Sequence, residues 1–333
     1  MTDLRTPASA LLRRLPLIGL YPAEYRAAHG EEIAAVLAEA VRHADRRDAL
    51  REWAALAAHA LRLRTRLSSR DPAGRILAGA APFLLAGGAA LSVVHLLTGL
   101  LLPESSTDFA RAAVGAAQTV PWALALLCLT LGRLAPARAL VLAAVLSRIG
   151  VAAAAQFHPG TALTQYADPL RLWVVMGVLA LIAPPDAVDG SPRGRSWTMA
   201  SAVALALPMS GLAVLWLGTW PEDYGNVVFP SSVQSVLDAS TLWPALVMTL
   251  AYLLHLGSPD TDPLRAGGVA LAVLPWTVMV APPLYRSAPT DHHDLLRNAG
   301  AVLALLAVAT IVGTLRRTAR RNRTRPGASD PTA

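Results

Sequence analysis

Long apolar runs separated by short polar segments dominate the chain after residue 75. The first run, Ile76–Leu102, holds 27 residues without an Asp, Glu, Lys or Arg. At about 1.5 Å of rise per residue, a helix of this length reaches about 40 Å and exceeds the membrane hydrocarbon core of about 30 Å. The run therefore predicts a transmembrane helix. Similar runs follow at Ala113–Leu131, Ala139–Phe157, Leu170–Ala183, Trp197–Trp220, Ser240–Gly257, Ala266–Leu284 and Ala299–Leu315.

Residues 1–75 show another pattern, in which apolar residues recur at spacings of three and four among charged ones. A helix is predicted to start at Tyr21-Pro22, because proline suits the first turn. A second helix is expected to end at Asp71-Pro72. Two such amphipathic helices can pack as a hairpin, or lay their apolar faces on a partner or on the membrane surface. The apolar positions are Tyr25, Ile33, Val36, Leu37, Ala40 and Val41 in the first helix, and Leu50, Trp53, Ala54, Ala57, Leu61 and Leu67 in the second.

These patterns predict an all-α protein in three parts. Residues 1–75 form a cytoplasmic amphipathic helical domain, residues 76–315 a bundle of about eight transmembrane helices, and residues 316–333 a basic, disordered cytoplasmic tail. Leu170–Ala183 is the shortest of the predicted spans. Its loss would reverse the side of every later loop.

Composition supports a membrane protein, since 54% of the residues are hydrophobic and only 15% are charged. The formal net charge of +7 would also suit a nucleic-acid-binding protein. However, the arginines stand at the ends of apolar runs, where the membrane explains them, so we expect no nucleic-acid partner. The single cysteine, Cys128, forms no intrachain disulfide and offers no multi-cysteine metal site.

The distribution of arginines predicts the orientation of the spans. All 29 basic residues are arginines, and with eight spans and a cytoplasmic N-terminus, 24 of them fall in cytoplasmic segments and 4 in outside loops. This bias is what the positive-inside rule expects. We therefore predict a bacterial plasma-membrane protein with both termini in the cytoplasm.

A motif near the N-terminus carries a family resemblance. It consists of Leu11-Leu12-Arg13, Leu20-Tyr21-Pro22, Tyr25-Arg26 and His29-Gly30-Glu31-Glu32. This string resembles the permease-prefix, or signalling-associated helical, domain at the cytoplasmic start of many actinobacterial multi-pass integral membrane proteins. The resemblance covers about residues 10–67 and implies a docking or regulatory module, with Tyr21, Pro22, Tyr25, Arg26, Gly30 and Glu31 as candidate partner-docking residues. This chain carries additional residues at Leu15–Gly19 and lacks the large extracytoplasmic domain of the macrolide-exporter permeases.

Three polar side chains within the predicted spans are candidate intramembrane sites: Arg148, His95 and His255. A charge as deep as Arg148 is costly and usually faces a bundle interior or an aqueous cavity. It is either an anion or substrate contact or a structural arginine. The two histidines are either a joint ligand site, if their helices are adjacent, or separate helix–helix contacts.

No sequence pattern predicts catalysis, a metal or another cofactor. The cluster Asp291-His292-His293-Asp294 has four metal-capable side chains, but adjacent residues rarely converge on one ion, so a solvated loop is favoured. Met209-Ser210-Gly211 lacks the glycine pattern and histidine of a serine nucleophile. No acidic residue lies in any predicted span, which argues against a proton-relay transporter.

Two functional hypotheses follow. The first is a non-enzymatic membrane protein whose N-terminal helices dock a cytoplasmic partner, such as a transcriptional regulator or a transport ATPase. The alternative is a permease or transport subunit that moves a small or lipophilic solute around Arg148. An intramembrane enzyme is disfavoured because no catalytic group of residues is apparent. The partners expected are the lipid bilayer, the cytoplasmic protein and a second copy of the chain.

Overall fold

The computed structural model describes residues 20–42, 44–101, 109–157, 170–218, 231–258, 262–279 and 292–324. Within these ranges every regular element is a helix, so the predicted all-α class is confirmed. The chain divides into two compact units, Met1–Arg75 and Ile76–Ala333. Each unit is described by itself below.

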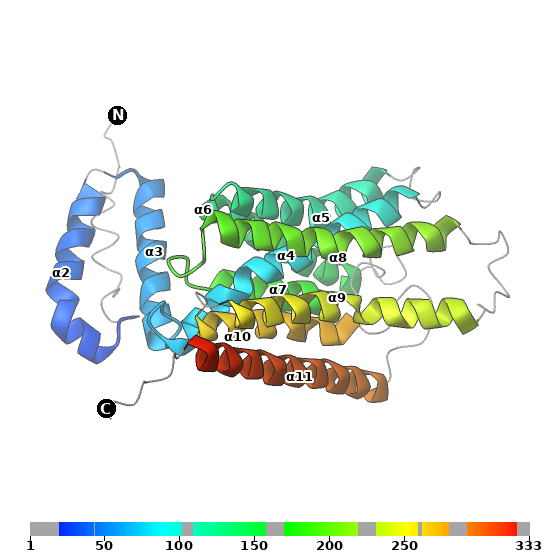
Figure 1. Ribbon diagram of the computed structural model, residues 1–333. Helices are drawn as coiled ribbons and strands as arrows, with labels where there is room; N and C mark the ends of the chain where they lie inside the picture. Colours follow the sequence, from blue (N-terminus) through cyan, green and yellow to red (C-terminus); the bar gives the residue numbers. More distant parts are fainter. Residues whose placement is uncertain are drawn as a thin grey trace, which may run out of the picture. The chain divides into compact units, whose positions relative to one another are not determined.

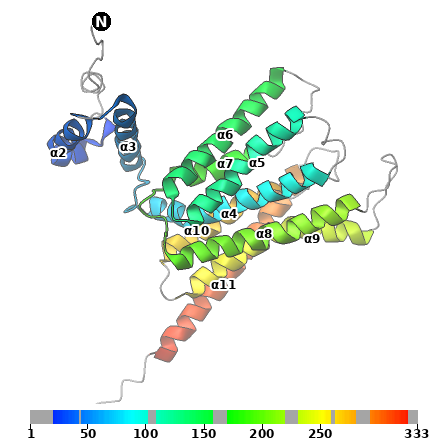
Figure 2. The ribbon, with the colours of Figure 1, turned by 90° about the horizontal axis from the view of Figure 1, so that it is seen from above.

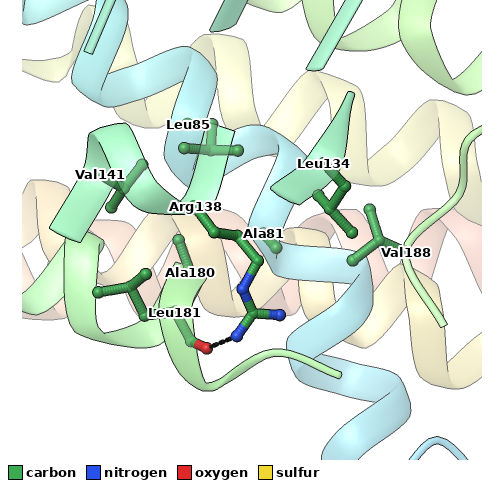
Figure 3. A pocket seen from close by; sticks show the side chains of 8 residues that line it. All are labelled: Ala81, Leu85, Leu134, Arg138, Val141, Ala180, Leu181 and Val188. Carbon is green, nitrogen blue, oxygen red and sulfur yellow. Dashed lines mark hydrogen bonds between the residues drawn. The ribbon is translucent and has the colours of Figure 1, made fainter. Parts of the chain in front are cut away.

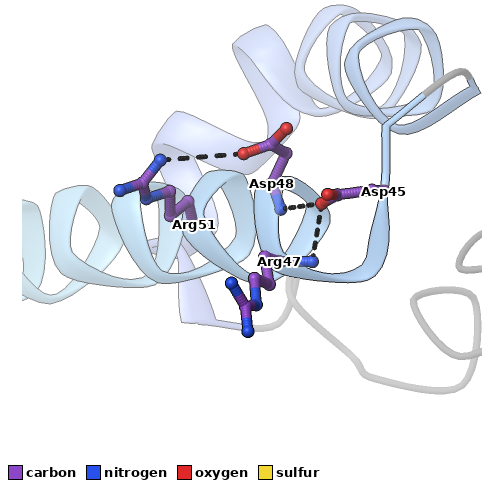
Figure 4. A network of polar contacts seen from close by, with 4 residues as sticks. All are labelled: Asp45, Arg47, Asp48 and Arg51. Carbon is purple, nitrogen blue, oxygen red and sulfur yellow. Dashed lines mark hydrogen bonds and ion pairs between the residues drawn. The ribbon is translucent and has the colours of Figure 1, made fainter.

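The first unit contains helix α2 (Ala23–Arg42) and helix α3 (Arg46–Arg64). Asp45 caps the start of α3, because its Oδ1 accepts hydrogen bonds of 2.8 Å from the backbone N–H groups of Arg47 and Asp48 (Figure 4). The helix ends where Arg66 adopts a left-handed conformation with φ of 54°. Pro72 does not close α3, as the sequence suggested, but is the first residue of α4, a position that proline favours.

The second unit contains the remaining helices, which lie side by side as a bundle (Figures 1 and 2). They are α4 (Pro72–Leu101), α5 (Phe109–Thr130), α6 (Leu134–Phe157), α7 (Leu170–Ile182), α8 (Pro192–Gly218), α9 (Ser231–Gly257), α10 (Pro263–Val273), the 3-10 helix η4 (Leu274–Met279) and α11 (His292–Thr324). Helix α11 continues through part of the segment predicted to be a disordered tail. Arginine is a good helix former and suits the C-terminal end of a helix, which explains the extension.

Helix α4 lies at the centre of the bundle. In the most apolar stretch of 18 residues within its segment Pro72–Val94, 83% of the residues are buried, against 17% in the corresponding stretch within Ala299–Ala319 of α11. Close packing around α4 depends on glycine. A Cβ atom on Gly88 would lie 2.2 Å from the fully buried ring of Trp122 in α5, and one on Gly268 of α10 would lie 2.1 Å from the Ile76 carbonyl oxygen. The uncharged character of the described part of this run is thus explained by its burial within the protein.

Three helices are long and apolar enough to cross a membrane, within the residues that the structure describes. Their apolar segments are Pro72–Val94, Leu134–Ala154 and Ala299–Ala319. Shorter apolar segments of 10–17 residues lie in α5, α7 and α9. The 13 residues of α7 span about 20 Å, less than the hydrocarbon core. A membrane protein is therefore compatible with the structure, whereas the count of eight spans stays a prediction.

Candidate functional site

Arginine side chains cap the carbonyl ends of neighbouring helices at one end of the bundle. Arg195, in the first turn of α8, donates to the carbonyl oxygen of Thr130 at the end of α5, at 3.2 Å. Arg317 of α11 donates to Leu256 near the end of α9. The last carbonyls of a helix lack intrahelical partners and carry a partial negative charge, so these contacts stabilise the helix ends. The arginines that predict orientation thus also join the helices together.

Arg138, in the first turns of α6, performs the same role for α7. Its guanidinium donates to the carbonyl oxygens of Leu181 and, at 2.9 Å, of Ala183, as Figure 3 shows for Leu181. The cavity beside it measures only about 10 Å³, and Leu85 and Val141 are among its apolar lining residues. A space of this size holds at most one water molecule. Arg138 is therefore a helix-capping residue and the cavity is not a ligand site.

Arg148, the first candidate site residue, is 2% exposed on α6. Its guanidinium carbon lies 4.4 Å from the centroid of the Trp173 ring of α7, and Trp173 packs against Trp122 of α5 with ring centroids 5.4 Å apart. A desolvated cation–π contact of this kind is worth about 2 kcal/mol. Arg148 thus joins α5, α6 and α7, which supports the structural interpretation of this residue.

His255, the second candidate, lies in a cleft of about 310 Å³ that α4, α8, α9 and α10 form together. Its ring packs edge-on with the rings of Phe83 and Trp197, with distances between ring centroids of 5.3 Å and 5.7 Å. Its Nδ1 lies 2.9 Å from the Ala251 carbonyl oxygen, and because a carbonyl only accepts, Nδ1 must carry the proton. In the neutral imidazole, Nε2 is then an acceptor.

Charged side chains of both signs line this cleft. Arg193 and Asp189 are exposed near the start of α8, whereas Arg265 and Asp262 are half-buried at the start of α10. The aspartates also order the backbone. The Oδ1 of Asp189 accepts a hydrogen bond of 2.9 Å from the Ser191 N–H, and the Oδ1 of Asp262 accepts one of 3.1 Å from the Leu264 N–H. The formal charges of the four side chains sum to zero.

His95, the third candidate, is not brought near His255. Position 95 lies in α4, and His255 meets that helix at Phe83. The two positions on α4 are 12 residues apart, which corresponds to about 18 Å along the helix. The side chain of His95 lies outside the described part of the chain.

The predicted docking residues fall into two groups in the α2–α3 hairpin. Tyr21 is 2% exposed, stacks on Tyr25 at 5.5 Å and contacts His59 of α3 at 6.0 Å. Burial raises the pKa of the Tyr21 phenol, the neighbouring Tyr25 raises it further, and Arg62 lowers it. These tyrosines hold the two helices together. Of the others, Pro22 and Gly30 are half-buried, whereas Arg26 and Glu31 are exposed and available to a partner.

Apolar side chains also lie on the surface of this hairpin. Val36 is 62% exposed on α2, and Leu50 and Leu61 are 61% and 62% exposed on α3. Leu50 and Leu61 are separated by 11 residues, three turns of helix, and therefore share one face. The predicted apolar stripe of α3 is thus divided, with one part packed in the hairpin and the other exposed.

Several residues of the His255 cleft have no distinctive sequence pattern. Trp197, Arg193, Arg265 and Asp189 come from separate segments, and only His255 was identifiable as a polar residue in an apolar run. Among the described residues, no group of three His, Cys, Asp or Glu side chains is placed to hold a metal ion. The side chains of the cluster at 291–294 lie outside that part. No protein-family model, curated protein or solved structure matches this chain.

Proposed function

We propose that this chain is a multi-pass protein of the bacterial plasma membrane whose α2–α3 hairpin docks a cytoplasmic protein, either a transcriptional regulator or a transport ATPase. In this proposal the bundle spans the membrane eight times, both termini are cytoplasmic, and the chain itself is not an enzyme. The permease-prefix resemblance of residues 10–67 supports a docking role for the N-terminal helices.

The exposed apolar side chains of the hairpin carry the proposal. A solvated helix pair gains nothing from exposing Val36, Leu50 and Leu61 by more than 60% each. Full burial of such a side chain is worth about 1.5–3 kcal/mol, so covering the remaining surface of all three would contribute about 3–5 kcal/mol to binding. Charged neighbours such as Arg26 and Glu31 would then form the polar rim that surrounds the apolar centre of a typical interface.

Site-specific photocrosslinking in the native host tests the docking role. A photoreactive amino acid at Leu61 of the full-length chain should crosslink one cytoplasmic protein, which is then identified by mass spectrometry. The control variant carries the photoreactive amino acid at Glu52, an exposed position of α3 that lies outside the face of Leu50 and Leu61. The same crosslinks from both positions, or crosslinks to lipid alone from Leu61, would refute the proposal.

A permease function around Arg148 is the second candidate, because a guanidinium 2% exposed inside the bundle can contact an anionic or polar solute. Proteoliposomes with the wild-type chain should then take up a solute that Arg148→Gln proteoliposomes do not. Unchanged uptake in Arg148→Gln would exclude this residue from transport and leave the cation–π contact as its role.

A further inference from the structure

The His255 cleft belongs to the second unit, not to the α2–α3 hairpin. It is large enough for a ligand, at about 310 Å³, and all of its lining residues belong to the second unit. Buried Ala78 and Val269 give it an apolar floor, while exposed Asp189 and Arg193 stand at its polar mouth. A ligand that fits this gradient has a polar and an apolar end.

The charges at the mouth indicate what the polar end must be. Two guanidinium groups, of Arg193 and Arg265, attract an anion, but the two carboxylates of Asp189 and Asp262 repel it. A simple cation is attracted by the two carboxylates but repelled by the two guanidinium groups. A zwitterion satisfies both signs, because its anionic group faces the arginines and its cationic group the aspartates.

The interior of the cleft adds polar groups that suit the same ligand. His255 presents Nε2 as an acceptor once Nδ1 donates to the Ala251 carbonyl oxygen. Trp197 supplies an indole, the aromatic group that attracts an ammonium most strongly. The imidazole nitrogen can accept a hydrogen bond from a primary ammonium, and the indole ring can attract its positive charge. No further acidic residue is needed inside the cleft.

The cleft also has an apolar side. Leu254 of α9 lines it and is 44% exposed. Leu250 and Leu246 are exposed one and two turns before Leu254, respectively, so the three form a stripe along α9. In a membrane bundle, exposed leucines of this kind face lipid. A lipid chain lying on the stripe would place its headgroup at the cleft.

We propose that the cleft binds a phospholipid with a zwitterionic headgroup, one that joins a phosphate to a primary ammonium. The phosphate contacts the guanidinium groups of Arg193 and Arg265. The ammonium contacts Asp189 and Trp197, and an acyl chain follows Leu254. This site rests on the proposed membrane location but not on docking by the hairpin.

Lipid binding to the purified full-length chain, followed by native mass spectrometry, tests the site. Phosphatidylethanolamine and phosphatidylglycerol are offered at equal concentration, and phosphatidylethanolamine should be retained preferentially. Arg193→Gln and Asp189→Asn should each lower its retention about tenfold, the effect of losing one charge-assisted hydrogen bond. Asparagine keeps the oxygen that accepts from Ser191 N–H, so the local fold is preserved. Arg133→Gln, which removes an exposed arginine outside the cleft, should change retention less than twofold.

Equal retention of the two lipids, or equal retention by wild type, Arg193→Gln and Asp189→Asn, would overturn the proposal. Soluble glycerophosphoethanolamine distinguishes between a membrane lipid and a water-borne molecule as the source of the headgroup. If it binds in the cleft while the lipid does not, the ligand is a water-borne molecule and the lipid assignment is wrong. Leu61→Ser, which disrupts the docking face, should leave lipid retention unchanged, so failure of the docking proposal is distinguishable from failure of this one.

Discussion

Replacement of Gly268 by alanine tests the packing of α10 on the central helix. A Cβ atom at this position would lie 2.1 Å from the Ile76 carbonyl oxygen and 2.7 Å from the Ala80 nitrogen. Both are backbone atoms of α4, so no side chain can rotate to make room. The adjacent Gly267 provides a matched control, since its nearest neighbour, the Cγ1 of Ile76, is 3.9 Å away in ordinary contact.

The expected destabilisation follows from how far the distance between the added Cβ and the Ile76 carbonyl oxygen falls below a relaxed contact. A relaxed contact between carbon and oxygen needs about 3.3 Å, so α4 and α10 must separate by about 1.2 Å near Gly268. Overpacking of this kind costs about 1–3 kcal/mol. Gly→Ala also favours the helix by about 1 kcal/mol, but this gain is common to both variants and cancels in the comparison. Gly268→Ala should therefore unfold about 1–3 kcal/mol more easily than Gly267→Ala.

Thermal unfolding of the two purified variants in the same detergent measures this difference through tryptophan fluorescence. At about 2–4 °C of Tm per kcal/mol, a difference of 2 kcal/mol lowers the Tm of Gly268→Ala by about 4–8 °C relative to Gly267→Ala. Equal Tm values for the two variants would show that α4 and α10 do not approach each other as closely as described.

Three further predictions concern helix ends and the hairpin. Arg138→Gln should lower the free energy of unfolding by about 1.5–3 kcal/mol through loss of hydrogen bonds to the end of α7, whereas exposed Arg133→Gln should change it by less than about 0.5 kcal/mol in the same denaturation assay. Asp45→Ala removes the cap of α3 and should destabilise the hairpin by about 1 kcal/mol, read as faster amide hydrogen exchange in residues 46–64, while Asp45→Asn should restore protection. Because burial favours the neutral phenol of Tyr21, its contribution to stability should be complete below the ordinary tyrosine pKa of about 10 and be lost as the pH rises through the higher folded pKa. An ultraviolet difference titration of wild type against Tyr21→Phe should show this late ionisation, and a phenol that titrates at the ordinary pKa would contradict it.

The helices of the bundle were largely predictable because uncharged runs record burial in protein or lipid. The segment Ile76–Leu102 is the clearest case, since both the absence of charge and the glycines at its contacts are local features. Helix boundaries were less predictable. Pro72 was predicted to close the second helix, but α3 ends at Arg64 and Pro72 is the first residue of α4.

The cleft could not be predicted, because its lining comes from segments far apart in the chain. Gly79, Asp189, His255 and Arg265 lie on separate elements, and no local spacing connects them. Tyr21 illustrates the same limit. It was a candidate contact for an external partner, but it packs against His59, 38 positions later, and is buried within the hairpin.

The side of the membrane on which the arginine-capped end of the bundle lies tests the account most directly. In a Cys128→Ala background, single cysteines replace Asp186, an exposed residue between α7 and α8, and Ser105, in the predicted outside segment after the first span. A membrane-impermeant maleimide should label Ser105→Cys in intact cells and Asp186→Cys only after lysis. Labelling of Asp186→Cys in intact cells would contradict the predicted number of spans and the orientation on which the proposed docking depends.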